Sequence, residues 1–222
     1  MAKTFISALE AECVIFDLDG TLVDTAPDLL ATLNVLLGEL GRRPLTLPEI
    51  KSAIGLGAKT LLRNGANLTG APLSEDQIEE MFDKYIAYYS AHIADHTAPF
   101  PGAVEVLEAC REAGVKLAIC TNKLDSLSHQ VLAALHLDGY FDAVIGSDTL
   151  GVQKPDPETV LEILRRTGAS PEKTLFVGDS QTDLETARAA GVAIVLVDYG
   201  YSATPAHELT PDAVISHLRE IL

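Results

Sequence analysis

The sequence predicts an α/β protein: a Rossmann-like parallel sheet core domain with a small all-helical domain inserted after the first strand. From residue 101 onward, apolar runs of strand length alternate regularly with helical segments, a pattern typical of parallel sheets with right-handed crossovers. Between residues 23 and 97 the apolar spacing is helical instead. We therefore expect a core domain made of residues 1–22 and 98–222, with residues 23–97 as the helical insert.

The first strand and the insert come first along the chain. Residues 13–16 form a short apolar run, and Gly20 marks the turn that ends this segment. Pro27 suits the first turn of one helix, and Ser74 is expected to cap another. The predicted helices of the insert span residues 27–40, 48–54, 58–67 and 74–93, and a linker follows at 95–102.

The second part of the chain supplies the rest of the sheet. Its predicted strands span residues 115–120, 143–145, 174–177 and 193–197, with a short one at 212–215. Its predicted helices span residues 103–113, 126–135, 157–167 and 183–190, with a last one at 217–222. In this alternation the helices between strands serve as crossover connections in a parallel sheet.

Composition and charge exclude several classes of partner. The 222 residues carry a net charge of −16, whereas a nucleic-acid surface needs a basic face. An anionic membrane surface is disfavoured for the same reason, and no apolar run is long enough to span a bilayer. The first 20 residues lack the pattern of a signal peptide, so we expect a cytoplasmic protein without nucleic-acid or membrane partners. The sequence does not indicate the oligomeric state.

Polar residues gather directly after the predicted strands. Asp17 and Asp19 follow the first strand, Thr121 and Asn122 the second, and Asp179 the fourth. A single strand-end aspartate is commonly a turn former, but three such strand ends indicate a site. In an open parallel sheet, ligands bind outside the carboxyl ends of the strands, near the point where the strand order reverses. We therefore expect these residues to converge on one cleft.

Four acidic residues would lie close together at this edge of the sheet: Asp17, Asp19, Asp179 and Asp183. Such a cluster requires a cation, because like charges in one place repel each other. The available ligands are oxygen atoms and no histidine accompanies them, which suits Mg²⁺ better than Zn²⁺. Lys154 precedes a predicted helix. It is either a solvated surface lysine or a fixed positive charge for the carboxylates or a transferring group.

Together, these segments resemble the motifs of the haloacid dehalogenase superfamily of phosphotransferases. The segment DLDGTLVDT at residues 17–25 looks like the first motif, and Thr121-Asn122 looks like the second. Lys154 matches the third motif, and residues 178–183 match the fourth. The motifs occur in the expected order over nearly the whole chain, and the helical insert resembles the small cap domain of this family.

The resemblance implies a role for each acid in a transfer through an aspartyl-phosphate. Asp17 would be the nucleophile, while Asp19 would donate a proton to the leaving alcohol and later take one from water. Mg²⁺ would be held by the carboxylates of Asp17 and Asp179 and by the backbone carbonyl of Asp19. Asp183 would orient a metal-bound water or the lysine.

The same resemblance implies which residues bind the phosphoryl group and what type of substrate the protein acts on. Thr121, Asn122 and Lys154 would hold the phosphoryl oxygens, with Lys154 also part of the catalytic set. An acid at Asp19 suits an alkoxide leaving group rather than a halide, so the expected substrate is a small phosphorylated metabolite. Within the superfamily the pattern is most similar to the phosphoglycolate phosphatases. This implies Mg²⁺-dependent hydrolysis of 2-phosphoglycolate to glycolate and phosphate.

The insert holds one candidate for binding the rest of the substrate. Gly55 and Gly57 precede a predicted helix, and Lys59 and Arg63 lie four residues apart on one of its faces. A helix start with basic residues attracts anions, so it is a candidate site for a second negative group such as a carboxylate. The alternative is a solvated basic face on an amphipathic helix.

The last predicted helix of the insert carries three tyrosines, Tyr85, Tyr88 and Tyr89. Aromatic side chains of this size usually fill a core. They are interpreted as packing residues of the insert, and a substrate role is left open for one of them.

Other functions fit the same motifs. A β-phosphoglucomutase-like phosphomutase or a small-pyrophosphate hydrolase would need the same Asp17, Asp19 and metal, so the core does not separate them from a phosphatase. An alternative of another class is a non-catalytic regulator that binds a phosphorylated metabolite on a relict site. The complete set of acid, metal and lysine positions favours an enzyme.

Overall fold

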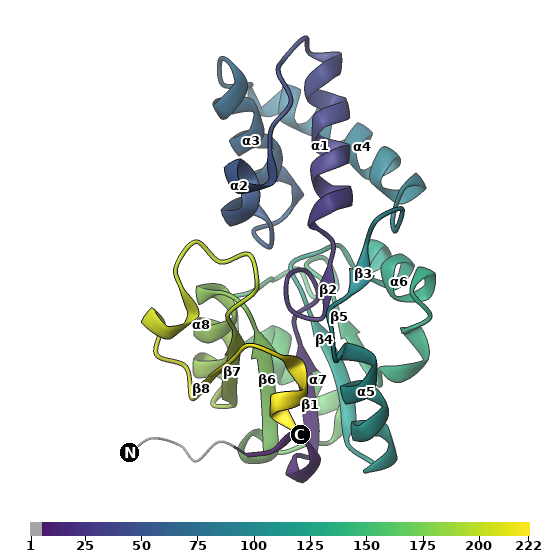
Figure 1. Ribbon diagram of the computed structural model, residues 1–222, viewed down its shortest axis with the longest axis vertical. Helices are drawn as coiled ribbons and strands as arrows, with labels where there is room; N and C mark the ends of the chain where they lie inside the picture. The colour runs from purple at the N-terminus through teal and green to yellow at the C-terminus, as the bar shows by residue number, and fades with distance from the viewer. Residues whose placement is uncertain (1–5) are drawn as a thin grey trace.

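The computed structural model describes residues 6–222, so residues 1–5 of the predicted core domain lie outside the described residues. The described chain forms two parts stacked along the long axis of the molecule, as Figure 1 shows. One part is a sheet with helices packed against it, and the other is a group of helices at the top of the view. This arrangement confirms the predicted fold class, an α/β core with a helical insert after the first strand.

A six-stranded parallel sheet forms the centre of the α/β part. Its strands are β1 (Cys13–Phe16), β4 (Lys116–Cys120), β5 (Ala143–Ile145), β6 (Thr174–Gly178), β7 (Ala193–Val197) and β8 (Ala213–Ile215). The strand order is β5-β4-β1-β6-β7-β8, so β1 lies between β4 and β6. The order reverses at β1, and a ligand is expected beyond its carboxyl end.

Helices cover both faces of this sheet, because its strands are apolar on both sides. The helices are α5 (Ala103–Glu112), α6 (Asp125–Ala134), α7 (Glu158–Thr167), α8 (Gln181–Ala190) and the 3₁₀ helix η6 (Leu218–Ile221). On one face α5, α6 and η6 pack around Phe16 and Val177, and on the other α7 and α8 pack around Ile15 and Phe176. The helix predicted at 217–222 is present as the shorter 3₁₀ helix η6.

The insert folds around its own apolar cluster. Its elements are α1 (Ala26–Glu39), α2 (Leu47–Ile50), the 3₁₀ turn η2 (Lys51–Ala53), α3 (Ala58–Thr69) and α4 (Glu75–Ala91). The predicted helix at 48–54 is therefore a short α-helix followed by a 3₁₀ turn. Leu62 and Ile78 are buried in the shared cluster of these helices. Ser74 caps α4 as predicted, because it exchanges hydrogen bonds with Gln77 in a capping box.

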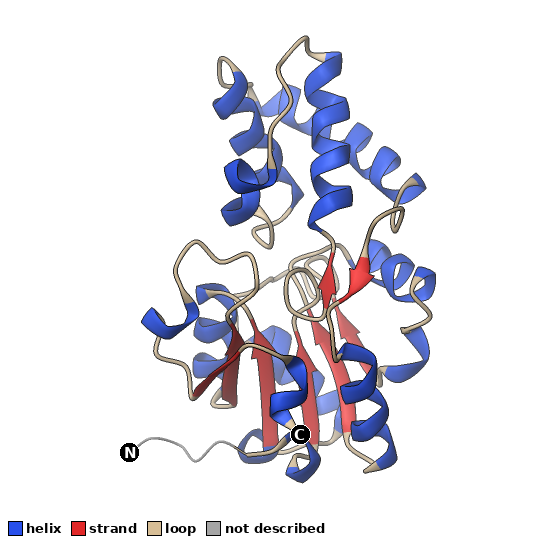
Figure 2. Cartoon of the chain, viewed as in Figure 1, coloured by secondary structure: helices blue, strands red, loops and turns tan. Residues whose placement is uncertain are grey.

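A short ribbon joins the two parts where the chain crosses between them, as Figure 2 shows. Strand β2 (Val23–Asp24) pairs antiparallel with β3 (Ala98–Pro99). The sequence predicts neither strand: residues 23–24 precede the predicted helix at 27–40, and residues 98–99 lie in the predicted linker. Strands of two residues are too short to show an alternating pattern. The predicted limits of the insert, residues 23 and 97, lie at this ribbon.

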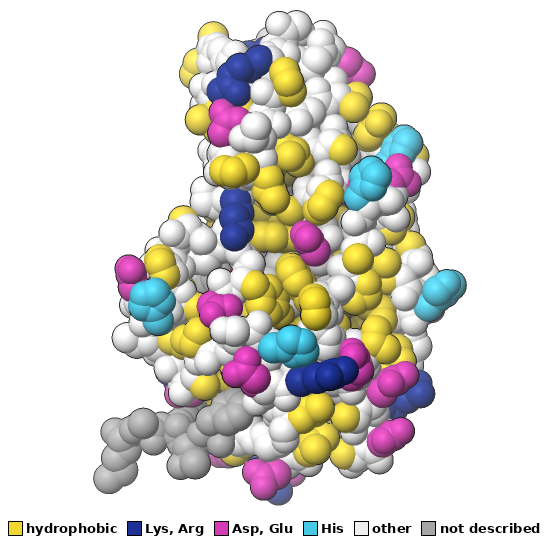
Figure 3. Space-filling view, viewed as in Figure 1, with side chains coloured by type: hydrophobic (Ala, Val, Ile, Leu, Met, Phe, Trp, Pro, Cys, Tyr) yellow, Lys and Arg dark blue, Asp and Glu magenta, His cyan; other side chains and the backbone are white. Residues whose placement is uncertain are grey.

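The surface of the molecule carries scattered charges. On the face drawn in Figure 3, Lys and Arg side chains are few and separated, and they do not form a basic patch. Among residues 6–222, none of the helices has both the length and the apolar character that a membrane crossing requires.

Candidate active site

Asp17 and Asp19 lie in the tight turn that follows the central strand. Strand β1 ends at Phe16, and the backbone N–H of Asp17 still donates to Val177 of β6 at 2.9 Å. Gly20 then adopts a φ of +89°, and a Cβ at this position would lie 2.7 Å from the ring of Tyr201. Only glycine suits both the conformation and the space. The turn therefore holds both acids at the carboxyl end of the sheet.

Lys154 is buried between two carboxylates at this edge. Its Nζ lies 2.8 Å from Oδ1 of Asp17 and 2.6 Å from Oδ1 of Asp183. Only 4% of the lysine surface is exposed, so it is not a solvated surface lysine. Burial alone would lower the pKa of Lys154, but the two carboxylates raise it above its usual value, and the side chain keeps its charge.

Three buried carboxylates form a group that fits a metal ion. Asp17, Asp179 and Asp183 each offer an oxygen atom, and these oxygens lie within 4.8 Å of one another. Burial raises the pKa of Asp17 to about 7, against the opposite influence of Lys154. Burial and the neighbouring carboxylates raise the pKa of Asp179 well above its usual range. A hard cation with oxygen ligands would relieve this crowding, and the donor set fits Mg²⁺.

Asp183 is fixed in place by the start of α8. Its Oδ2 accepts hydrogen bonds from the backbone N–H groups of Asp179 and Ser180 and from the Ser180 hydroxyl. Its Oδ1 remains for Lys154. The same residue thus takes part in the cap of the helix and contacts the lysine.

The Asp19 carboxylate points to a different set of partners from the metal group. Lys123 Nζ lies 2.8 Å from its Oδ1 and 3.0 Å from its Oδ2, and the Thr25 hydroxyl donates to Oδ1 at 2.7 Å. The same ammonium lies 4.8 Å from the centre of the Tyr89 ring, which belongs to the insert. Sequence reasoning missed Lys123, although it directly follows Thr121-Asn122 and its position was the available signal.

Thr121 and Asn122 lie at the carboxyl end of β4, next to the loop that carries Lys154. Asn122 Nδ2 donates to the backbone carbonyl of Lys154 at 3.2 Å, and Thr121 Oγ1 accepts from the backbone N–H of Lys123 at 3.1 Å. Both side chains are buried. The structure therefore brings together the predicted residues from three strand ends, as the fold requires.

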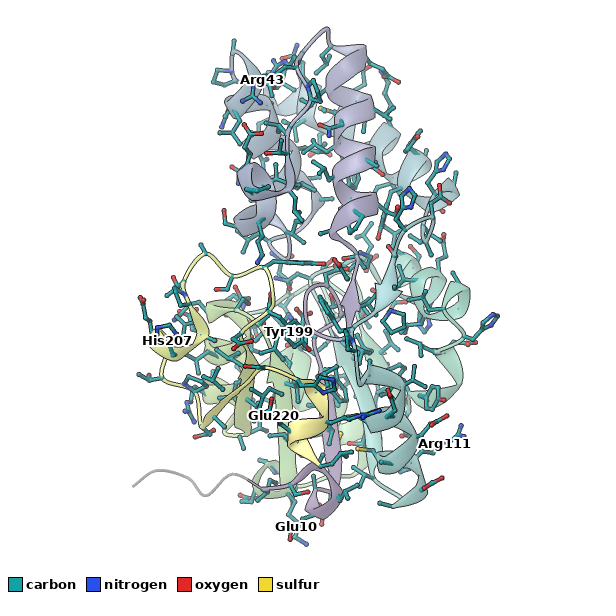
Figure 4. All side chains as sticks on the ribbon, viewed as in Figure 1. Glu10, Arg43, Arg111, Tyr199, His207 and Glu220 are labelled. Atoms are coloured by element: carbon teal, nitrogen blue, oxygen red, sulfur yellow. The ribbon has the colours of Figure 1, made fainter. Side chains whose placement is uncertain are left out.

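Two tyrosines after β7 complete this edge, and sequence reasoning missed both. The backbone N–H of Tyr201 donates to Oδ2 of Asp179 at 2.6 Å, and its hydroxyl bonds to Asp24 and to the backbone N–H of Ala26. Tyr199, labelled in Figure 4, donates its hydroxyl to the carbonyl of Thr21 at 2.9 Å. Their hydrogen bonds hold the turn that follows β1 and the start of α1 in place. No sequence motif indicated these two tyrosines.

A pocket of about 420 Å³ lies between the two parts. From the α/β part it is lined by Asp19, Asn122 and Lys123. The four predicted insert residues also line it: Gly55, Gly57, Lys59 and Arg63. Within the described chain, the metal carboxylates and Lys154 are not among the lining residues. The pocket thus meets the carboxyl end of the sheet at Asp19.

The two basic residues of the insert already have acidic partners. Lys59 Nζ bonds to both carboxylate oxygens of Glu79, at 2.6 and 2.7 Å. The Arg63 guanidinium bonds to Glu75 through two nitrogens. All four side chains are exposed. The charge of this helix face is therefore largely neutralised within the insert.

Gly55 and Gly57 lie in the loop before α3, where the backbone adopts a left-handed conformation. Their φ angles are +86° and +89°, a region that favours glycine. A Cβ at either position would meet no atom within 4 Å. The conformation, and not crowding within the chain, explains the glycines, and the open space leaves their backbone accessible from the pocket.

Comparison with known proteins agrees with this arrangement. The sequence matches the haloacid dehalogenase-like hydrolase family over residues 14–197. It is 42% identical over 213 residues to a phosphoglycolate phosphatase of Caulobacter vibrioides, covering 96% of this chain and 90% of that protein. It is 38% identical over 201 residues to a phosphoglycolate phosphatase of Agrobacterium fabrum, covering 90% of this chain and 86% of that protein.

A solved structure shows the same fold. The crystal structure of a predicted phosphoglycolate phosphatase from Haemophilus somnus superimposes with a TM-score of 0.90 at 30% identity. The match covers 96% of this chain and 96% of that chain, so it includes both the sheet and the insert. Sequence and fold agree, and the chain belongs to the haloacid dehalogenase-like hydrolase family.

Proposed function

We propose that this protein is a cytoplasmic, Mg²⁺-dependent phosphatase that hydrolyses a small phosphate monoester, with 2-phosphoglycolate as its substrate. One observation carries the proposal: the buried Lys154 joins Asp17 to Asp183, beside Asp179, at the reversal point of the sheet. Buried charges of this kind cost stability, so they indicate chemistry. The names of the two curated relatives support the choice of substrate.

Asp17 and Asp179 would hold the Mg²⁺ ion through their carboxylates, together with the backbone carbonyl of Asp19. The donor atoms are oxygens and are crowded enough to need a cation. When bound, the ion would supply positive charge that offsets the developing charge on the phosphoryl oxygens. Asp183 would act indirectly, by orienting Lys154.

Different residues of the chain would attack phosphorus and hold the phosphoryl oxygens. An Asp17 oxygen would attack phosphorus, so that a bond forms from Asp17 to phosphorus while the bond from phosphorus to the leaving oxygen breaks. Lys154, Thr121 and Asn122 would hold the phosphoryl oxygens during this step. Water would then attack the aspartyl-phosphate and release inorganic phosphate and free Asp17.

Asp19 is suited to move the protons of both steps. It lines the pocket where a leaving group would sit, whereas Asp17 does not. We assign it the donation of a proton to the leaving alcohol and the later removal of a proton from the attacking water. Thr25 and Lys123 hold its carboxylate in place from two sides.

The helical insert, residues 23–97, would act as the cap over this site. Its residues form most of the pocket lining, and the chain crosses between the insert and the sheet at the β2–β3 ribbon. A cap that excludes water during the transfer supports catalysis.

A substrate panel tests the proposed function. Purified protein with Mg²⁺ is assayed against 2-phosphoglycolate, several sugar phosphates and pyrophosphate, with free phosphate and isomerised sugar phosphate both measured. We expect release of phosphate with a clear preference for 2-phosphoglycolate. Equal rates over the panel would reject the dedicated substrate, and isomerisation without release of phosphate would indicate a mutase.

A further inference from the structure

Three of the unsatisfied polar atoms of the described chain belong to residues that line the pocket. The buried side-chain atoms of residues 6–222 without a hydrogen-bond partner are Thr21 Oγ1, Tyr85 OH, Tyr89 OH and Asn122 Oδ1. The last three residues line the pocket between the two parts. Buried polar groups are nearly always hydrogen-bonded in folded proteins, and an unpaired one costs stability. The two phenols at this cavity indicate that a ligand supplies the missing acceptors, whereas Asn122 Oδ1 is itself an acceptor and would need a donor.

Tyr85 and Tyr89 present two donors on the same side of the insert. They lie one turn apart on α4, and their rings stack with centroids 6.0 Å apart. Both side chains are almost fully buried. Burial raises the pKa of both phenols well above its usual value, so each keeps its proton and can donate a hydrogen bond.

A third donor reaches the same place from the α/β part. Lys123 lines the pocket, and its ammonium lies 4.8 Å from the centre of the Tyr89 ring. An ammonium group has three donors, and two oxygens of Asp19 accept from this one. The start of α3 in the insert is less suited to bind an anion. Its basic residues Lys59 and Arg63 are exposed and already paired with acidic side chains, Glu79 and Glu75.

We propose that Tyr85, Tyr89 and Lys123 form the specificity site that binds the carboxylate of the leaving group. The inference rests on the proposed phosphatase function and moves the binding of the second negative group from Lys59 and Arg63 to these three residues. A carboxylate has two oxygens with about four acceptor positions, enough for all three donors. The site lies beside Asp19, the residue assigned to protonate the leaving oxygen of the same substrate.

Single-atom substitutions test this proposal. Tyr85→Phe and Tyr89→Phe remove only a hydroxyl, and Tyr88→Phe is the control, because Tyr88 lies on α4 but stacks on His92 and does not line the pocket. Each protein is assayed with 2-phosphoglycolate and with ethyl phosphate, which has a methyl group in place of the carboxylate. We expect Tyr85→Phe and Tyr89→Phe each to lower kcat/KM for 2-phosphoglycolate about tenfold, mainly through KM.

Ethyl phosphate should be hydrolysed by these variants within about twofold of the wild-type rate, because it makes no contact that the substitutions remove. Thermal unfolding provides a second measurement. Both variants should be at least as stable as the wild type, since each loses a buried hydroxyl without a partner. Tyr88→Phe should leave kcat/KM unchanged for both substrates.

The outcomes separate this inference from the proposed function. Equal losses on both substrates, or no loss on either, would overturn the specificity site while leaving the phosphatase function intact. A wild-type protein that hydrolyses both esters equally would do the same, because no carboxylate would then be recognised. A wild-type protein that hydrolyses neither would overturn the proposed function and the inference with it.

Discussion

The molecule holds two sets of paired charges that differ in one respect, access to water. At the end of the sheet, Lys154 lies between Asp17 and Asp183, and all three side chains are at most 6% exposed. In the insert, Lys59 pairs with Glu79 across a surface where both side chains are at least 40% exposed. Arg63 and Glu75 repeat that exposed arrangement.

The comparison supports our assignment of function to the buried charges. Exposed pairs gain little in water and lose further by salt screening, so they contribute little to the folded state. Buried charges lose hydration that their partners only partly replace, so they are weak evidence for stability. Charges kept at that cost indicate a reaction, and the two sets should respond differently to substitution.

Replacement of the nucleophile should have the largest effect on activity. We expect Asp17→Asn to lower kcat about 10⁴-fold or more, because an amide cannot form the aspartyl-phosphate. Phosphate release under saturating 2-phosphoglycolate is the measurement. The exposed Asp76 provides a matched control, and Asp76→Asn should retain wild-type activity. Retention of more than about a tenth of the activity by Asp17→Asn would remove the nucleophile assignment.

Loss of the buried lysine should reduce both activity and stability. Lys154→Met leaves two buried carboxylates without their cation, which we expect to cost about 3 kcal/mol of unfolding free energy. It should also lower kcat/KM by about 10³-fold, because a donor to the phosphoryl oxygens is lost. Denaturant unfolding and steady-state kinetics check the two effects. Lys173→Met is the control, since Lys173 is 62% exposed in its pair with Glu12. An equal loss of stability and activity in Lys173→Met would contradict the difference that we infer between buried and exposed pairs.

Magnesium should stabilise the protein by relieving the repulsion among Asp17, Asp179 and Asp183. At about 100 times its Kd, we expect Mg²⁺ to raise Tm by about 5–10 °C. Without metal, Asp179→Asn should melt no lower than the wild type, because one of the crowded charges is removed. The same variant should show no shift when Mg²⁺ is added. A full magnesium shift in Asp179→Asn, seen by differential scanning calorimetry, would place the metal elsewhere.

The exposed pairs of the insert should give the smallest effects. Lys59→Ala and Arg63→Ala should each leave kcat/KM for 2-phosphoglycolate within about twofold of the wild-type value. Both residues line the pocket, so the assay is sensitive to them if they bind the substrate. A tenfold loss on 2-phosphoglycolate with none on ethyl phosphate would return the carboxylate site to the start of α3, against the specificity site proposed above.

Much of the fold could be predicted because its signals are local. The apolar runs of the sheet and the helical spacing of the insert predicted nearly every long element, and Ser74 predicted the start of α4. The β2–β3 ribbon was missed because its strands are two residues long. The final helix was predicted, but the spacing of four residues does not distinguish an α-helix from the 3₁₀ helix that is observed.

Topology alone predicts only the part of the site whose side chains follow strands of the sheet. Strand ends converge by topology, so Asp17, Asp179 and Thr121 could be placed together from their positions alone. Lys123 directly follows Thr121-Asn122, which places it near the site, but its partner Asp19 is 104 residues away in sequence and could not be predicted. The pairing of Lys59 with Glu79, 20 residues away on another helix, could not be predicted from the sequence either.

Chemical trapping of the covalent intermediate shows directly whether Asp17 is the nucleophile. The protein is quenched with borohydride during turnover of 2-phosphoglycolate, digested and sequenced by tandem mass spectrometry. Borohydride reduces an acyl phosphate to an alcohol and leaves free carboxylates intact, so phosphorylated Asp17 would be recovered as homoserine. We expect homoserine at position 17 only when substrate is present. An intact Asp17 in samples that are releasing phosphate, or reduction at another carboxylate, would contradict it.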